Sequence, residues 1–219
     1  MTKTVLWVLL VLSGSYWGFL KYPGFLFKHS AEHRGFVLLS PKPMDKPGIE
    51  YLDKAIERLE TSPLYSPSRK FEVYLAGPGF LYSLMTPLCG DSLGCSYSLI
   101  DDRIVLPVPH VSEAGVAILV RQAIYDLVQE QMEPLQYIFL KDWKMEGYAE
   151  SIGGETLGYA ASAVCGNDDV PEDFRKKLEK RLVVEILMSD DKIGFMALLD
   201  ANYAYEHALK RMMLRHCGK

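Results

Sequence analysis

The chain has 219 residues, of which 49% are hydrophobic and 24% are charged. These proportions are those of an ordinary globular chain, and the length suffices for one domain with a sizeable core or for one domain with two lobes. The formal net charge of −4 indicates no general affinity for nucleic acid, so we expect no nucleic-acid partner.

The chain begins with an apolar segment. Residues 5–20 carry no charged side chain and lie between Lys3 and Lys21. This stretch is somewhat shorter than the roughly 20 residues that span a bilayer, and it also suits the apolar part of a signal peptide. Its tryptophan and tyrosine residues are typical of membrane interfaces. We therefore expect residues 1–21 to be a membrane anchor, with a cleaved signal segment or a buried core helix as the alternatives.

Either membrane interpretation places the rest of the chain outside the cytoplasm, on the periplasmic or extracellular face, with the membrane as a partner of the N-terminal helix. Residues 22–34 are expected to be a linker, and residues 35–219 a single domain. Its first part, residues 35–110, is expected to be a sheet lobe. Strands are predicted at residues 35–40, 71–75 and 103–108, and helices at residues 49–59 and 80–85.

The second part of the domain, residues 111–219, is expected to be a helical lobe. Apolar residues recur there at helical spacing, and Pro171 suits the first turn of a helix. A small sheet followed by a helical half predicts an α+β fold. The helices are predicted at residues 114–132, 143–159, 171–188 and 194–216.

The most informative stretch is residues 142–150, with the sequence DWKMEGYAE. Glu146 and Glu150 are four residues apart, so a helix places both carboxylates on one face. In the preceding apolar helix, Gln122 and Asp126 share a face in the same way. Two neighbouring helices that offer polar residues at this spacing have the geometry of a helix-borne metal site.

The pattern Trp-x-x-Glu-Gly-x-Ala-Glu, about twenty residues after an apolar helix, resembles the second metal-binding segment of gluzincin-type zinc peptidases. The resemblance covers residues 114–158, and the soluble part as a whole is similar to small membrane-anchored peptidase-like proteins of this type. It implies that Glu146 stands at the third-ligand position and that residues 122–129 stand where the family carries H-E-x-x-H and the residues that follow this motif. Gln122 and Asp126 then replace the two histidine ligands, and Ala123 replaces the general base. The order of a sheet lobe before helices also resembles the family's layout.

Three hypotheses about function follow. Ala123 has no group that takes the proton from metal-bound water, so the first is a membrane-anchored extracytoplasmic domain that is catalytically inactive and binds a peptide or a protein. The second is an active hydrolase with a non-standard metal set, and the third is a structural, envelope-associated domain. The candidate binding cleft comprises Gln122, Asp126, Glu146, Glu150 and Tyr203.

We expect no cofactor, and the alternative is a divalent metal ion. Gln122, Asp126 and Glu146 offer oxygen ligands, which suit calcium or magnesium better than zinc. His110 lies just before the first of these helices and is a further candidate ligand, although a lone histidine before a loop is usually structural. Tyr203, together with Tyr205 and His207, belongs to the last predicted helix, which is expected to face the same cleft.

The chain contains four cysteines. Cys89 and Cys95 flank a short, turn-rich loop, and this spacing predicts a disulfide, which fits an oxidising compartment. Cys165 and Cys217 are far apart in sequence, and the sequence leaves open whether they pair or stay free. No Cys-x-x-Cys pair occurs, so a thiolate zinc site is not expected.

Overall fold

The computed structural model describes residues 2–43, 47–86, 94–97, 103–107, 113–133, 136–137, 139–166 and 170–218. Within them the fold is α+β, as the sequence predicts. The strands are β1 (His29–His33), β2 (Phe36–Ser40), β3 (Phe71–Leu75), β4 (Cys95–Tyr97) and β5 (Arg103–Leu106). The α-helices are α1 (Thr2–Lys21), α2 (Pro47–Leu59), α3 (Phe80–Met85), α4 (Glu113–Glu130), α6 (Asp142–Gly153), α7 (Glu172–Asp190), α8 (Phe195–Asp200) and α9 (Tyr205–Cys217). The 3₁₀ helices are η1 (Pro23–Phe25), η2 (Glu155–Gly158) and η3 (Ala161–Cys165).

The described strands form one sheet in the order β1-β2-β3-β5-β4. β2, β3 and β5 run parallel in the centre, whereas β1 and β4 are antiparallel to their neighbours at the two edges. The central strands are the three that the sequence predicts, because their apolar runs suit strands that are buried on both faces. β1 has the polar sequence HSAEH and lies at an edge, so it carries no hydrophobic pattern that predicts a strand.

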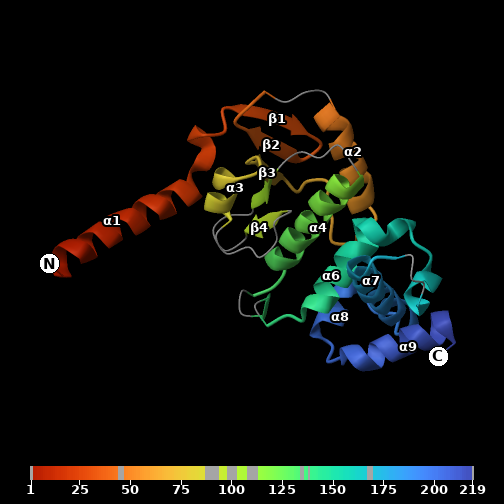
Figure 1. The fold of residues 1–219 in the computed structure, drawn as a ribbon. Coiled ribbons are helices and arrows are strands. Elements are labelled where there is room, and N and C mark those ends of the chain that lie inside the picture. The colour runs from red at the N-terminus through yellow and green to blue at the C-terminus, as the bar shows by residue number, and fades with distance from the viewer. Residues whose placement is uncertain are drawn as a thin grey trace.

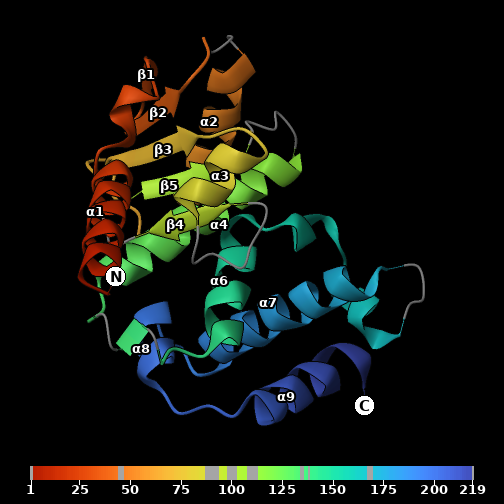
Figure 2. The ribbon, with the colours of Figure 1, turned by 60° about the vertical axis from the view of Figure 1, so that its left-hand side comes forward.

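Helices cover both faces of the sheet (Figures 1 and 2). Val73 and Ile104 belong to the main hydrophobic core, which the sheet shares with α2 and α4. Tyr74 and Val105, the next residues along the same strands, belong to a smaller core that includes α3 and Phe19 of α1. Successive residues of a strand point to opposite faces, so the end of α1 and the helix α3 lie on the face opposite to α2 and α4.

The second half of the chain forms a helical group in which α6 packs against both α4 and α7 (Figure 2). Gly147 lies where α6 and α7 cross, and a Cβ atom there would lie 2.3 Å from the carbonyl oxygen of Lys180. Any larger residue would push the two helices apart. The glycine that follows Glu146 is therefore explained by helix packing.

The expectation of a linker at residues 22–34 needs correction. These residues form η1 and then β1, which pairs with β2 along its whole length. Phe27 is only 4% exposed and packs against Tyr74, with ring centroids 5.0 Å apart. Because this segment contributes a strand and a core residue, α1 connects directly to the domain.

Two predicted helices also have different bounds. The helix expected at residues 143–159 ends at Gly153, and the chain continues as η2. The helix expected at residues 194–216 is two helices, α8 and α9. The break follows from a contact distant in sequence, since the ammonium group of Lys144 binds the last carbonyl groups of α8.

The structure shows the pairing of two cysteines that the sequence leaves undecided. Cys165 and Cys217 are disulfide-bonded, with their Cα atoms 5.4 Å apart, and they join η3 to the end of α9. Cys95 is disulfide-bonded as well. Cys89, the partner that the sequence predicts for it, lies outside the described residues.

Helix α1 projects from the body of the molecule (Figure 1). Every residue from Val5 to Leu12 is more than half exposed, and the tryptophan among them, Trp7, is 68% exposed. Among the described residues, none of the helices combines the length and the apolar character that crossing a membrane requires.

Candidate functional site

The candidate residues lie on α4 and α6, which pack against each other beside the sheet. α4 is buried around most of its surface, because it packs on the sheet, on α2 and on α6. Gln122 and Asp126 are 3% and 1% exposed. Polar side chains this deeply buried require partners, and these partners determine what the site can do.

Asp126 is held by an arginine from outside the two helices. Arg69, two residues before β3, donates from Nη2 to Asp126 Oδ2 over 3.0 Å and from Nη1 to Glu130 Oε1 over 3.3 Å. Its guanidinium group also lies over the ring of Phe71, 5.7 Å from the centroid. The carboxylate at the expected ligand position therefore joins α4 to the start of β3.

Gln122 and Ala123 face different surroundings. A Cβ atom added to Gly94, just before β4, would lie 3.2 Å from Cγ of Gln122, so this side chain packs under the edge of the sheet. Ala123 has no exposed surface and belongs to the main core. The position that the resemblance assigns to the general base is thus occupied by a core methyl group.

Glu146 is bound by a residue of α7. It forms an ion pair with Lys180 of α7, and its side chain is 41% exposed. Arg69 and Lys180 lie on separate elements, so Asp126 and Glu146 are each neutralised by a basic residue of their own.

Glu150 has a local structural role. It is 4% exposed, and its Oε2 atom accepts hydrogen bonds from the backbone N–H of Thr156 over 3.3 Å and from the Thr156 hydroxyl over 3.0 Å. A Cβ atom on Gly154 would collide with this carboxylate. Glu150 therefore ties the end of α6 to η2.

Tyr125 lies on α4 between Gln122 and Asp126 in the sequence. Burial is the main reason that its pKa is raised far above the ordinary value, and the negative charges of Glu146 and Glu150 add to the shift. Its phenol is therefore neutral at physiological pH and acts as a hydrogen-bonding or packing group. The sequence analysis did not single out Tyr125, although it lies between Gln122 and Asp126 on the same helix.

These residues do not fit a zinc ion. The side chains of Gln122, Asp126 and Glu146 offer oxygen ligands, whereas zinc sites are usually built from nitrogen and sulfur donors. Both carboxylates also form ion pairs with basic residues. In the described part of the chain, no three histidine, cysteine, aspartate or glutamate side chains are grouped to hold a metal ion. His110 lies outside the described residues.

Tyr203 and its neighbours face another part of the molecule. Tyr203 lies between α8 and α9, and its hydroxyl donates a hydrogen bond to Asp191 at the end of α7. The ring of Tyr205 packs on Trp143 with centroids 5.4 Å apart, and burial raises the pKa of Tyr205 to about 12. These contacts hold α9 against α6 and α7.

Lys144 is a buried polar residue for which the sequence predicts no role. It is 2% exposed, and Nζ donates to the carbonyl oxygens of Leu198, Leu199 and Ala201 over 2.7, 3.0 and 2.6 Å. Burial lowers its pKa from the ordinary value, and the nearby charge of Lys141 adds to this effect. Carbonyl groups at a helix end need donors, so Lys144 fixes α8 against α6.

Comparison with known proteins gives no significant match: no protein-family model fits the chain, and neither a curated protein nor a solved structure is similar to it. The resemblance to gluzincin-type peptidases therefore rests on the pattern of residues in the two helices.

Proposed function

We propose that this chain is a membrane-anchored, extracytoplasmic domain with a peptidase-like layout that acts by binding a peptide or a protein segment and performs no hydrolysis. The observation that carries the proposal is the ion pair of Asp126 with Arg69. A buried carboxylate whose charge is balanced by an arginine is a structural element. Beside it, Ala123 offers no proton acceptor for hydrolysis.

The proposed location is supported by the disulfide chemistry and by α1. Disulfides persist in oxidising compartments and are rare in the cytosol, and both Cys95 and the pair Cys165–Cys217 are disulfide-bonded. The exposed side chains from Val5 to Leu12 are apolar. A lipid environment would remove them from water.

The peptidase-like layout is supported by the order and packing of the elements. A mixed sheet precedes two helices that pack against each other, and Glu146 lies on the second of them. The short strand β4 closes one edge of the sheet and is antiparallel to β5.

β4 is also where we propose that a partner binds. Among the described strands, β4 has a neighbour on one side only. Extended peptides bind proteins by pairing with the edge strand of a sheet. Gln122 packs against the residue that precedes this strand, so one of the candidate residues lies beside β4.

A peptide-recovery experiment tests the function. The full-length chain in detergent micelles is immobilised and incubated with a random peptide mixture, and retained and released peptides are sequenced by mass spectrometry. We expect a subset of peptides to be retained intact relative to an empty matrix. Retention no greater than that of the matrix contradicts the binding function.

The Glu146→Ala variant is the matched control for hydrolysis. We expect it to leave the released peptides unchanged, because the natural chain cleaves none of them. Cleaved peptides that appear with the natural chain and disappear with Glu146→Ala would overturn the proposal in favour of an active hydrolase.

A further inference from the structure

Helix α1 is fastened to the domain at its C-terminal end. Arg103 at the start of β5 donates from its two terminal nitrogens to the carbonyl oxygens of Leu20 and Lys21 over 2.6 and 2.7 Å. The hydroxyl of Tyr16 donates to the carbonyl oxygen of Leu84 in α3 over 2.8 Å. A cation at the C-terminal end of a helix also interacts favourably with the helix dipole. The direction of α1 is thus set by the domain.

Exposed aromatic residues surround the point where α1 leaves the body. Phe25 of η1 is 63% exposed and Phe80 at the start of α3 is 81% exposed, while Trp17 and Tyr22 are 56% and 68% exposed. η1 and α3 flank the base of α1 (Figure 1). We call these four residues the aromatic collar.

The aromatic collar is connected to the small hydrophobic core through Phe19. Phe19 of α1 contacts the small core that contains Tyr74 and Val105. Its ring also lies edge-on to Phe25, with centroids 6.1 Å apart. The exposed ring of Phe25 therefore rests on a residue that is packed against the domain.

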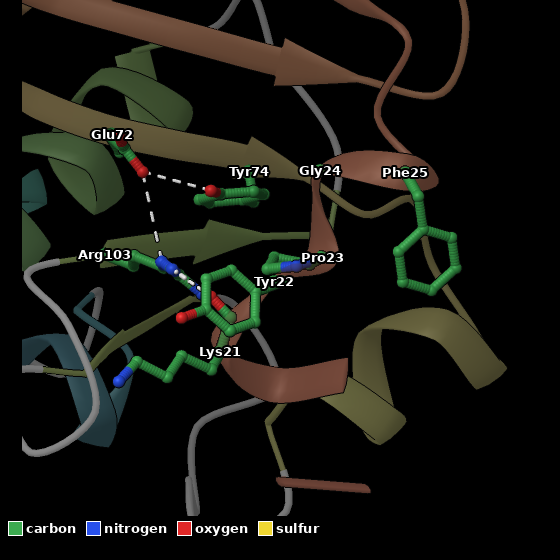
Figure 3. A pocket seen from close by; sticks show the side chains of 8 residues that line it. All are labelled: Lys21, Tyr22, Pro23, Gly24, Phe25, Glu72, Tyr74 and Arg103. Atoms are coloured by element: carbon green, nitrogen blue, oxygen red, sulfur yellow. Dashed lines mark hydrogen bonds and ion pairs between the residues drawn. The ribbon is translucent and has the colours of Figure 1, made fainter. Parts of the chain in front are cut away.

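Positive charge and a shallow hollow adjoin the collar. The hollow has a volume of about 460 Å³, and it is lined by the basic residues Lys21 and Arg103, by the carboxylate of Glu72 and by the rings of Tyr22 and Phe25, among others (Figure 3). Lys21 and Lys28 are both exposed. Aromatic rings next to basic side chains are the composition found at the interface between a bilayer and water.

The length of α1 gives an independent argument. The uncharged turns between Lys3 and the docked Tyr16 rise about 18 Å at ~1.5 Å per residue. The hydrocarbon core of a bilayer is about 30 Å thick. These turns are too short to cross that core while Tyr16 is docked on α3, so they can enter it from one side only, with the body of the domain next to the bilayer surface.

We propose that the aromatic collar lies in the headgroup region of a phospholipid bilayer, so that the domain rests on the membrane surface around α1. This inference depends on the anchoring part of the proposed function. It adds a second contact, made by η1 and α3, and it fixes the orientation of the domain relative to the membrane.

Tryptophan fluorescence quenching tests the collar in the full-length chain. Vesicles of phosphatidylcholine and phosphatidylglycerol carry a nitroxide either in the headgroup or deep in the acyl chain. The chain has three tryptophans, and the variant Trp7→Phe/Trp17→Phe leaves Trp143 as the background. Phe25→Trp and Phe80→Trp are added to this background separately. Leu214→Trp is the control, since Leu214 is 55% exposed on α9, far from α1 in Figure 1.

We expect the headgroup nitroxide to quench Phe25→Trp and Phe80→Trp several-fold more than Leu214→Trp. The deep nitroxide should quench Trp7, which the single variant Trp17→Phe reports. If Trp7 is quenched while Phe25→Trp and Phe80→Trp are quenched no more than Leu214→Trp, the collar proposal is wrong, but membrane anchoring by α1 is still supported. If Trp7 is not quenched either, the anchoring part of the proposed function fails with it.

Amide hydrogen exchange of the natural chain tests the contact between the collar and the bilayer without any substitution. We expect η1 and the start of α3 to exchange more slowly when vesicles are present, whereas α9 is unaffected. Equal exchange of η1 and α3 with and without vesicles would overturn the collar contact.

Discussion

Arg69 and Asp126 are 57 residues apart in sequence, yet Nη2 of the arginine lies 3.0 Å from Oδ2 of the aspartate. This ion pair connects the segment before β3 to α4. Asp126 is 1% exposed, whereas the side chain of Arg69 is 19% exposed. The charge at the expected ligand position is thus part of the framework that joins the sheet to the helical half.

Removing Arg69 should be strongly destabilising. Arg69→Met leaves a buried carboxylate without its cation, and breaking a buried pair in this way typically costs about 3–5 kcal/mol. The double variant Arg69→Met/Asp126→Leu should recover much of the loss, because no buried charge remains. Chemical denaturation measures the free energies of unfolding of the natural chain and of these two variants. Arg34→Met is the control, since Arg34 forms exposed ion pairs, which contribute at most about 1 kcal/mol. Equal losses for Arg69→Met and Arg34→Met would contradict a structural role for the buried pair.

Lys144 should contribute more to stability than its neighbour Lys141. Lys144→Met keeps much of the apolar stem but leaves three carbonyl groups without their donor, for which we expect a loss of about 2–4 kcal/mol in chemical denaturation. Lys141 donates to the carbonyl oxygen of Tyr203 over 3.0 Å, but this contact is exposed. Lys141→Met should therefore cost less than about 1 kcal/mol. A reversed order of the two losses would show that Lys144 does not secure α8.

The disulfide between Cys165 and Cys217 should stabilise the helical half. The two residues are 52 positions apart, and closing a loop of that length stabilises a protein by about 4 kcal/mol in the chain-entropy model. Cys165→Ser/Cys217→Ser should lower the free energy of unfolding by an amount of this order. Thermal and chemical unfolding without reductant compare the variant with the natural chain, and an unchanged stability would contradict the expected contribution.

The same cysteines test the location of the domain. If the domain lies outside the cytoplasm, rapid alkylation of freshly extracted protein should leave Cys165 and Cys217 unlabelled until a reductant is added. Mass spectrometry of the peptides that contain these residues reports the labelling. Ready labelling of both residues before reduction would contradict the oxidising compartment.

Local patterns predicted the central strands and the long helices, because residues 71–75 alternate as a strand does and the apolar residues of α4 follow a helical period. β1 was missed because a polar edge strand has no such pattern. The division into α8 and α9 was missed because it depends on Lys144, which lies more than fifty residues earlier. For the site, the sequence identified the two helices that pack together. It did not indicate that Arg69 and Lys180 bind the carboxylates, since these partners come from other elements.

We infer that the carboxylates of Asp126 and Glu146 stabilise the fold and hold no catalytic metal. Calorimetric titration with zinc of the full-length chain, purified without chelators and checked for metal content, tests this claim most directly. We expect no stoichiometric binding, and a titration curve that matches the curve of the Glu146→Ala variant. Stoichiometric zinc binding by the natural chain that is lost in Glu146→Ala would contradict the account.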